Sequence, residues 1–148
     1  MKDVDFIDCI FEHCDLLGKD FSNRGIQRCQ FLNCSLVGCD FLGSSIQDVL
    51  ILNSKCNYIN FSDSMIKHFL VQSSTFKESR FVSVEFKDIC FEEVDFYQSE
   101  FLNTKLNGID FSSCNIEKIA ITPNDVRGII VNYDQAILLS SLFGIIIK

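Results

Sequence analysis

The chain has 148 residues, 47% of them apolar, and a formal net charge of −7. This length predicts one domain, and the apolar content is enough for a continuous core, which excludes a disordered chain. The negative charge argues against direct binding of nucleic acid and is compatible with a basic protein partner.

The two ends of the chain predict where the protein works. Met1 leads directly into the charged residues 2–5, so the start lacks the apolar stretch of a secretory signal. The longest apolar run, Ile137 to Ile147, is interrupted by two serines and Gly144 and is shorter than the ~20 residues of a membrane span. We therefore expect a cytoplasmic protein that does not enter a membrane.

From Phe6 to Ile121 an apolar residue recurs at every fifth position without a break, which gives 24 five-residue units. A helix repeats its buried face every 3.6 residues and a strand every 2, so this period indicates a coil whose turns each contain whole units. In the middle of the chain six successive central residues are phenylalanine: Phe76, Phe81, Phe86, Phe91, Phe96 and Phe101.

A second inward series lies two residues before each central residue, starting at Val4, and is mostly small or β-branched. Because an unpaired buried charge is costly, charged residues should avoid both series. Before Thr122 only Lys19 and Arg24 break this rule, and Phe69 overfills a small position. We expect a local bulge or outward-turned side chains around Lys19 and Arg24; a functional pair of cations is the alternative.

Units such as Cys39-Asp40-Phe41-Leu42-Gly43 and Val94-Asp95-Phe96-Tyr97-Gln98 resemble the repeat of the pentapeptide-repeat family, and the resemblance covers residues 4–121. It implies an all-β solenoid, a right-handed quadrilateral β-helix with four units to a coil. Residues 20 apart should then stack, and this places Phe21, Phe41, Phe61, Phe81 and Phe101 in one column. The expected domain over residues 1–121 has about six coils.

Residues 122–148 are expected to form a C-terminal helical cap. Thr122 and Pro123 predict a short helix start with a hydroxyl cap, which Gly128 ends. Asn132 with Gln135 predicts the start of a helix over residues 133–143. An open coil end exposes apolar surface and an unpaired edge, so a helix that covers it is expected.

The cap helix is apolar on more than one face, and Ile137, Leu138, Leu142 and Phe143 cannot all contact the last coil. Similar helices in family members of the quinolone-resistance type form a two-fold interface, so the resemblance implies a homodimer through these four residues. The alternative is that the whole helix packs on its own coil.

The sequence favours a protein without catalytic, cofactor or metal sites. Six of the eight cysteines fall in the small inward series, Cys56 is a central residue and Cys90 is outward. Steps of five place consecutive cysteines on different sides of the coil, and no Cys-x-x-Cys pair occurs. Reduced core thiols are expected; the alternative is a disulfide between stacked neighbours, such as Cys9 with Cys29. We expect no enzyme.

Two functions remain open from the sequence. The resemblance to the quinolone-resistance members implies a DNA mimic that engages DNA gyrase, a type II topoisomerase, and protects it from inhibitors; this chain lacks the loops that Qnr-type members insert between coils. The alternative is a structural rod that binds an unknown protein partner. The candidate acidic partner surface consists of Asp5, Asp15, Asp20, Asp40, Glu85, Glu92, Glu93, Asp95 and Glu100.

Overall fold

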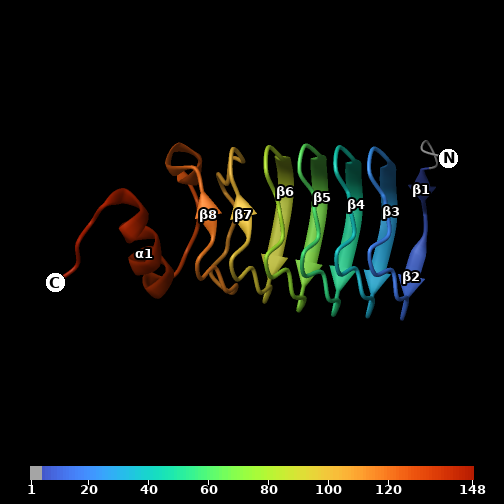
Figure 1. The fold of residues 1–148 in the computed structure, drawn as a ribbon, viewed down its shortest axis with the longest axis horizontal. Helices are drawn as coiled ribbons and strands as arrows, with labels where there is room; N and C mark the ends of the chain where they lie inside the picture. Colours follow the sequence, from blue (N-terminus) through green and yellow to red (C-terminus); the bar gives the residue numbers. More distant parts are fainter. Residues whose placement is uncertain (1–4) are drawn as a thin grey trace.

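The computed structural model describes residues 5–148, and it is a rod formed by a parallel β-solenoid of about six coils with one short α-helix at its C-terminal end (Figure 1). Val4 and Asp3, which the sequence places in the inward series and in an acidic cluster, lie outside the described residues. Paired strands are 20 residues apart in register, as in Ile26 with Ile46. This spacing confirms the prediction of four units per coil.

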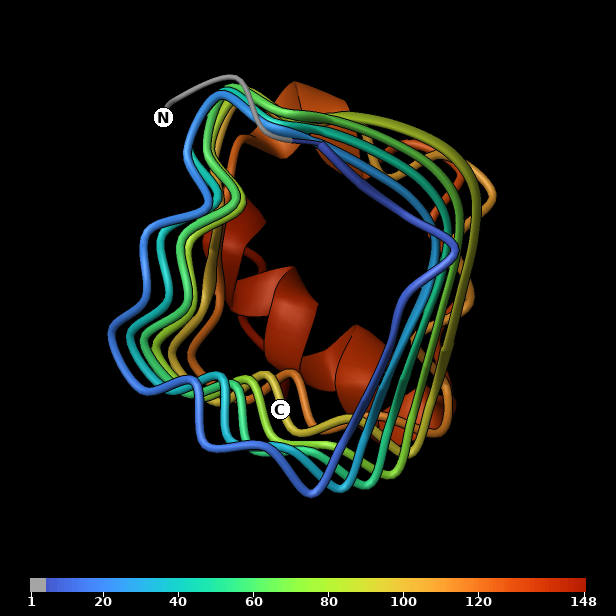
Figure 2. The ribbon, with the colours of Figure 1, turned by 90° about the vertical axis from the view of Figure 1, so that its right-hand side faces the viewer.

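Each coil has four sides when viewed along the rod (Figure 2). We name them A to D after residues 5–7, 10–12, 15–17 and 20–22 of the first coil and their equivalents every 20 residues. The strands are β1 (Phe6–Ile7), β2 (Ile10–Glu12), β3 (Gly25–Leu32), β4 (Ser45–Leu52), β5 (Met65–Gln72), β6 (Glu85–Glu92), β7 (Glu100–Phe101) and β8 (Ala120–Ile121). β3 to β6 therefore run along sides A and B, whereas β7 and β8 lie on side D.

The corners between sides depend on left-handed backbone. Every fifth residue from Asp8 to Lys118, with the exception of Ser113, has a positive φ. β-branched residues are strongly disfavoured at positive φ, and none of these positions holds Val, Ile or Thr. The three outward positions of a unit are therefore not equivalent. The last of them, two residues after the central residue, is selected for its ability to turn the chain and not for polarity alone.

The sides differ in how they turn. On sides C and D a tight turn closes many units; for example, the N–H of Cys39 donates to the carbonyl of Leu36 at 3.1 Å. Through β3 to β6 the chain instead runs as strands across sides A and B, and β3, β4 and β5 each pair with the strand of the next coil. Turned units and extended units therefore have the same five-residue sequence period.

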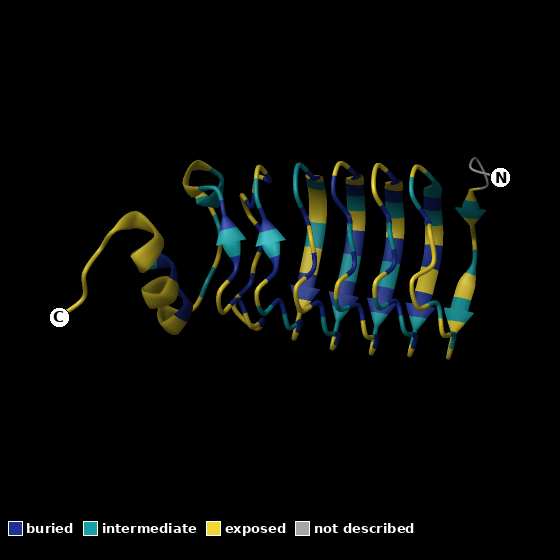
Figure 3. Cartoon of the chain, in the orientation of Figure 1, coloured by how far each residue is buried: buried dark blue, intermediate teal, exposed yellow. Residues whose placement is uncertain are grey.

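The core runs along the axis of the rod (Figure 3). Rings in the predicted column stack in parallel, with centroid distances of 4.8 Å for Phe21 and Phe41 and 5.0 Å for Phe81 and Phe101. Phe69 is also buried, and it packs edge-on against Phe61 at 5.9 Å. The interior of the coil therefore accommodates the large Phe69 side chain at a position where most units have a small one.

Lys19 is exposed, as expected for an outward-turned side chain, whereas Arg24 is only partly exposed and its Nε is buried without a hydrogen-bond partner. The register passes through this region without a bulge, since Asp20 pairs with Asp40 and Gly25 with Ser45. Both cations are therefore accommodated without a change of register.

The C-terminal segment covers the end of the rod. It consists of η1 (Pro123–Val126), α1 (Tyr133–Ser140) and η2 (Ser141–Phe143). Thr122 occupies the cap position of η1, but its hydroxyl accepts the N–H of Asn103 at 2.9 Å and makes no cap bond, so the expected hydroxyl cap was wrong. The predicted capping box of Asn132 and Gln135 is confirmed.

α1 lies across the open end of the last coil (Figure 2). Gln135 and Leu139 are its buried residues, one turn apart on the same face. None of the helices among residues 5–148 combines the length and apolar character needed to cross a bilayer.

Candidate binding surfaces

The nine acidic residues of the candidate partner surface do not share one side of the rod. Side A holds Asp5 and Glu85, side B holds Glu92 with Glu93 at the following corner, side C holds Asp15 and Asp95, and side D holds Asp20, Asp40 and Glu100. Most of them belong to the first and fifth coils. They therefore surround the rod at two levels and do not form a strip along it.

Several of these acids are engaged by the backbone of their own unit. The carboxylate of Asp20 accepts the N–H of Ser22 at 2.8 Å, and this bond lowers the pKa of Asp20. Asp40 accepts the N–H of Leu42 at 2.9 Å in the same way. Equivalent bonds hold Asp15 and Asp95. A carboxylate that bonds the backbone two residues on stabilises a turn, so these four residues have a structural role.

Cations interrupt the acidic columns. On side D Arg80 lies between Asn60 and Glu100, and its Nε is 3.1 Å from the Glu100 carboxylate. On side C Lys77 lies 3.7 Å from Asp95. The outer surface thus alternates in sign and contains short ion pairs.

The corner between sides A and B carries a ladder of charges. Arg28 Nε donates to Asp8 at 2.6 Å, and this hydrogen bond holds the pKa of Asp8 below its ordinary value. Two coils further on, His68 Nδ1 lies 3.4 Å from Asp88, and Asp48 occupies the position between the two pairs. Acidic and basic residue types therefore alternate between neighbouring coils at this corner.

Side B has an apolar outer surface that the sequence analysis missed. Its outward positions hold Ile10, Leu32, Leu50, Leu52 and Leu70, which we call the side B strip. All five are partly or fully exposed. Leu32 pairs with Leu52 and Leu50 with Leu70 on neighbouring strands, whereas Gln30 lies between Ile10 and Leu50. The signal was present in the sequence as leucine at positions where other units carry polar residues.

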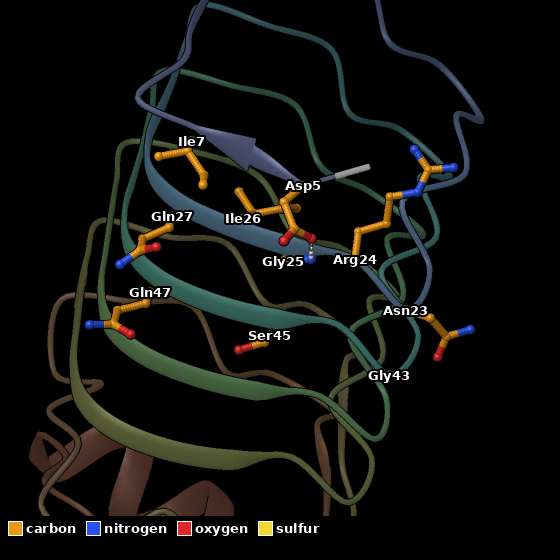
Figure 4. A pocket seen from close by; sticks show the side chains of 10 residues that line it. All are labelled: Asp5, Ile7, Asn23, Arg24, Gly25, Ile26, Gln27, Gly43, Ser45 and Gln47. Atoms are coloured by element: carbon orange, nitrogen blue, oxygen red, sulfur yellow. Dashed lines mark hydrogen bonds between the residues drawn. The ribbon is translucent and has the colours of Figure 1, made fainter. Parts of the chain in front are cut away.

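A shallow polar hollow of about 400 Å³ lies on side A near the start of the rod (Figure 4). The amides of Gln27 and Gln47 line it, and the Asp5 carboxylate accepts the N–H of Gly25 at 2.8 Å. Arg24 also borders the hollow, but Figure 4 shows its guanidinium directed away from the two glutamines. The arrangement offers amide and carboxylate hydrogen bonds and no nucleophile beside a base.

The cysteines are free thiols in a mainly buried setting. Five are buried, Cys9 and Cys14 are intermediate and Cys90 is exposed, which confirms its predicted outward direction. Burial raises the pKa of Cys39 to about 11 and raises the pKa of Cys56 well above its ordinary value. No group of three or more potential ligands among residues 5–148 could hold a metal ion.

This burial predicts the order of thiol modification. At pH 8 in native buffer, Ellman's reagent should modify Cys90 first, because thiolate formation at Cys39 and Cys56 is opposed by burial. The time course of labelling by intact-mass measurement, with peptide mapping, checks this. Cys90→Ser should remove the first phase; early modification of Cys39 or Cys56 in that variant would contradict the buried placement.

The C-terminal helix exposes the four residues of the predicted dimer surface. The exposed fractions are 54% for Ile137, 48% for Leu138, 45% for Leu142 and 47% for Phe143. Only Gln135 and Leu139 of α1 face the coil. The whole helix therefore does not pack on its own coil, and an apolar surface is left at the end of the rod (Figure 3).

Comparison with known families identifies the repeat. The profile described as the pentapeptide repeat region matches residues 4–81, which is just over half of the chain. The chain belongs to the pentapeptide repeat family. Proteins of this family are generally non-catalytic structural or binding proteins. A sequence comparison with curated proteins finds no match.

Solved structures of other pentapeptide repeat proteins are similar at low identity. Trypsin-treated QnrB1, a plasmid-mediated fluoroquinolone resistance protein, is 17% identical, with 98% of this chain and 92% of that chain covered and a TM-score of 0.36. HetL, involved in heterocyst differentiation regulation in the cyanobacterium Nostoc sp. strain PCC 7120, is 10% identical, with 86% and 65% covered and a TM-score of 0.38.

Proposed function

We propose that this pentapeptide repeat protein is a non-enzymatic rod that binds a protein partner through the side B strip. The observation that supports this most is the run of outward leucines on a flat, parallel sheet surface. Parallel sheets are usually covered on both faces, and contiguous exposed apolar surface on a soluble protein is typical of an interaction site. One face of this sheet covers the core, and the other is free for a partner.

The surroundings of the strip favour a specific contact. The charge ladder of Asp8, Arg28, Asp48, His68 and Asp88 borders it along one edge. An apolar centre with a polar rim is the usual anatomy of protein interfaces. Because the ladder alternates in sign, it can fix the register of a partner along the rod and adds little net attraction.

The strip is tested by paired substitutions and photo-crosslinking. Leu50→Glu with Leu70→Glu should abolish the crosslinks that a benzophenone amino acid at position 52 forms in cells, because two carboxylates would have to be buried at the contact. The matched control is Gln27→Glu with Gln47→Glu, which adds the same charge on side A. Loss of the same crosslinks in the control, or their persistence in the leucine variant, would exclude the strip as the contact.

A DNA mimic that engages gyrase is the second candidate, and the net charge of −7 favours it. Phosphates run along the length of a duplex, whereas the acids here surround the rod at two levels. This geometry supports mimicry less well than it supports a scaffold. A gyrase supercoiling assay with added protein, with and without ciprofloxacin and over a salt series, separates the two candidates. Salt-sensitive inhibition of gyrase, or protection of gyrase from the drug, would replace the scaffold proposal. No effect at tens of micromolar protein would retain it.

We also propose a homodimer formed end to end through α1 and η2. The half-exposed Ile137, Leu138, Leu142 and Phe143 support it, since full burial of an exposed side chain of this kind contributes roughly 1.5–3 kcal/mol and about half of that surface is still open on each. Leu142→Glu with Phe143→Glu should give monomers, measured as a halved mass by light scattering. Lys148→Glu, which makes the net charge more negative by the same two units near this end, controls for altered charge. An unchanged mass in the first variant would rule out this interface.

A further inference from the structure

Within residues 5–148, backbone hydrogen bonds between successive coils are interrupted on sides A and B between the fifth and sixth coils. We call this boundary the seam. In the sixth coil the N–H of Ile109 donates to the carbonyl of Leu106 at 3.1 Å, and that of Cys114 to Phe111 at 2.9 Å. These are the tight turns of sides C and D, now present on sides A and B. β6 in the fifth coil is extended on the same sides. The two backbone forms do not match across this seam.

The mismatch removes backbone bonds from the outer edge of β6 on side A and at the following corner. At the end of side B the two coils still touch, since the N–H of Glu93 donates to Ser113 Oγ at 3.1 Å and the Phe91 and Phe111 rings lie 5.6 Å apart. Elsewhere the N–H of Asp8 donates to Gln27 and the N–H of Gln30 donates to Cys9, both at 3.0 Å. The equivalent bonds, from Asp88 to residue 107 and from residue 110 to Ile89, are absent within residues 5–148. The sixth coil bonds instead to the cap, as when the N–H of Gly108 donates to Gly128 at 2.9 Å.

The seam is open to solvent. Two hollows of about 530 Å³ each adjoin it, and Phe86 and Lys105 line both. Phe86 and Ile89 are partly exposed, whereas Ile46 and Val49, their equivalents two coils earlier, are buried. The seam therefore combines free backbone groups with accessible apolar side chains. On sides C and D the coils stay joined, for example through the N–H of Asn115 and the carbonyl of Val94 at 3.0 Å.

Acidic residues surround the seam. Glu85 and Asp88 border the two hollows, and Glu92 ends β6; all three are exposed. Lys87 on β6 and Lys105 on the sixth coil are the neighbouring cations. The balance at this edge is negative, so charge complementarity favours a basic ligand.

We propose that the seam binds an extended, basic segment of a partner protein, which adds as a strand along the outer edge of β6. A strand supplies the alternating carbonyl and N–H groups that this edge lacks, as in other cases of β-augmentation. Its apolar side chains contact Phe86 and Ile89, and its lysines or arginines contact Glu85 and Asp88. The site contains none of the five residues of the side B strip and does not depend on it, although Asp88 also ends the charge ladder beside the strip.

The probe is a fluorescein-labelled, acetylated and amidated peptide, Lys-Val-Lys-Val-Lys-Val-Lys, added to the full-length protein and followed by fluorescence anisotropy. Saturable binding should protect amides of residues 85–93 from hydrogen exchange. The same peptide with alternate backbone amides N-methylated should bind at least tenfold more weakly, because one hydrogen-bonding edge is removed. Equal binding of the methylated peptide, protection confined to other residues, or no binding up to 1 mM would overturn the proposal.

Charge reversal tests the position of the site. Glu85→Lys with Asp88→Lys should weaken binding of the unmethylated peptide at least tenfold. The matched control is Asp48→Lys with Asp63→Lys, which makes the same change of charge at corners of coils whose edges are paired, and it should bind within twofold of the unaltered protein. Equal loss in both variants would show charge attraction without a site. Far-ultraviolet circular dichroism verifies the fold, and the methylated peptide tests the proposal on the unaltered protein.

Discussion

Phe81→Ala should destabilise the rod by about 4 kcal/mol, within the range of 3–5 kcal/mol typical of buried phenylalanine. Phe81 is fully buried, and its ring stacks between Phe61 at 5.2 Å and Phe101 at 5.0 Å. The substitution removes both stacking contacts and leaves a cavity at the centre of the column. Since native domains are stable by only 5–15 kcal/mol, this is a large fraction of the total.

Urea unfolding followed by circular dichroism measures the loss, and thermal unfolding should show a midpoint roughly 8–16 °C lower. Val82→Ala is the control, because Val82 is the next residue and lies on the outer surface. It should change the unfolding free energy by less than about 1 kcal/mol. A loss below 1 kcal/mol for Phe81→Ala, or equal losses for both variants, would mean that the column is not the continuous support of the rod.

The effect should also depend on position along the rod. In a solenoid each coil contacts only its neighbours, so stability is distributed among interfaces. Phe21→Ala removes a ring that stacks with Phe41 at 4.8 Å but that lies in the first coil, beside Phe6. Its loss is expected to loosen the N-terminal end without unfolding the centre. Hydrogen exchange along the chain distinguishes this local effect from global unfolding.

The inward columns could be predicted from sequence because burial alone determines them. A period of five with apolar central residues permits one arrangement in which every central side chain points to a common axis. The charged residues fit this arrangement because nearly all of them fall at outward positions. One exception has a simple physical reason: Lys19 is exposed, since solvation of a charge outweighs the preference of this position for an inward side chain. Phe69 stayed inside because an aromatic ring gains from burial.

The seam could not be predicted from this period, because turned and extended units share it. Only the backbone form distinguishes Ile26 to Cys29, which lie in a strand, from Leu106 to Ile109, which form a turn. A weaker signal was available. Asp20 and Asp40 precede turned units on side D, and Asp110 brings the same bond, to the N–H of Ser112 at 2.8 Å, to side B of the sixth coil.

The candidate surfaces were harder to predict for a related reason. An acidic residue looks the same in sequence whether it faces a partner or holds a turn, and Asp15, Asp20, Asp40 and Asp95 hold turns. The turn acceptors immediately precede the central residue, but so do Glu85 and Glu100, so position alone does not separate the two roles. Glu92 and Glu93 lie elsewhere in the unit; they accept hydrogen bonds from Gln72 at 2.8 Å and Ser73 at 3.4 Å and are exposed.

The attachment of the C-terminal cap depends on one buried amide, that of Gln135. Its Nε2 donates to the carbonyls of Phe111 at 2.8 Å and Cys114 at 2.7 Å, and its Oε1 accepts the N–H of Asn132 at 2.9 Å. The side chain is 5% exposed. The Gln135 side chain therefore makes hydrogen bonds to the last coil and to the start of α1 at the same time.

Gln135→Glu should detach α1 at pH 7, with a loss of about 3 kcal/mol or more. The substitution replaces a donor with a carboxylate that faces two carbonyl oxygens, and each unsatisfied buried group costs about 1–3 kcal/mol. Burial beside these oxygens would raise the pKa of the new carboxyl, so the variant should regain stability as pH falls toward 4–5, where the carboxyl is protonated. Hydrogen exchange of residues 133–143 measures detachment, and urea unfolding measures the coil.

Ala136→Glu is the matched control, because it adds the same charge one residue along at an exposed position of α1. It should leave exchange of the cap unchanged at both pH values. If Gln135→Glu detaches the cap while the coils keep their urea midpoint, the cap is a separate cooperative unit that covers the end without supporting the rod. If the coils unfold with it, the sixth coil, which is open to the fifth on sides A and B, requires the cap for its own stability. Protection of residues 133–143 that matches the unaltered protein at pH 7 would contradict the role given to Gln135.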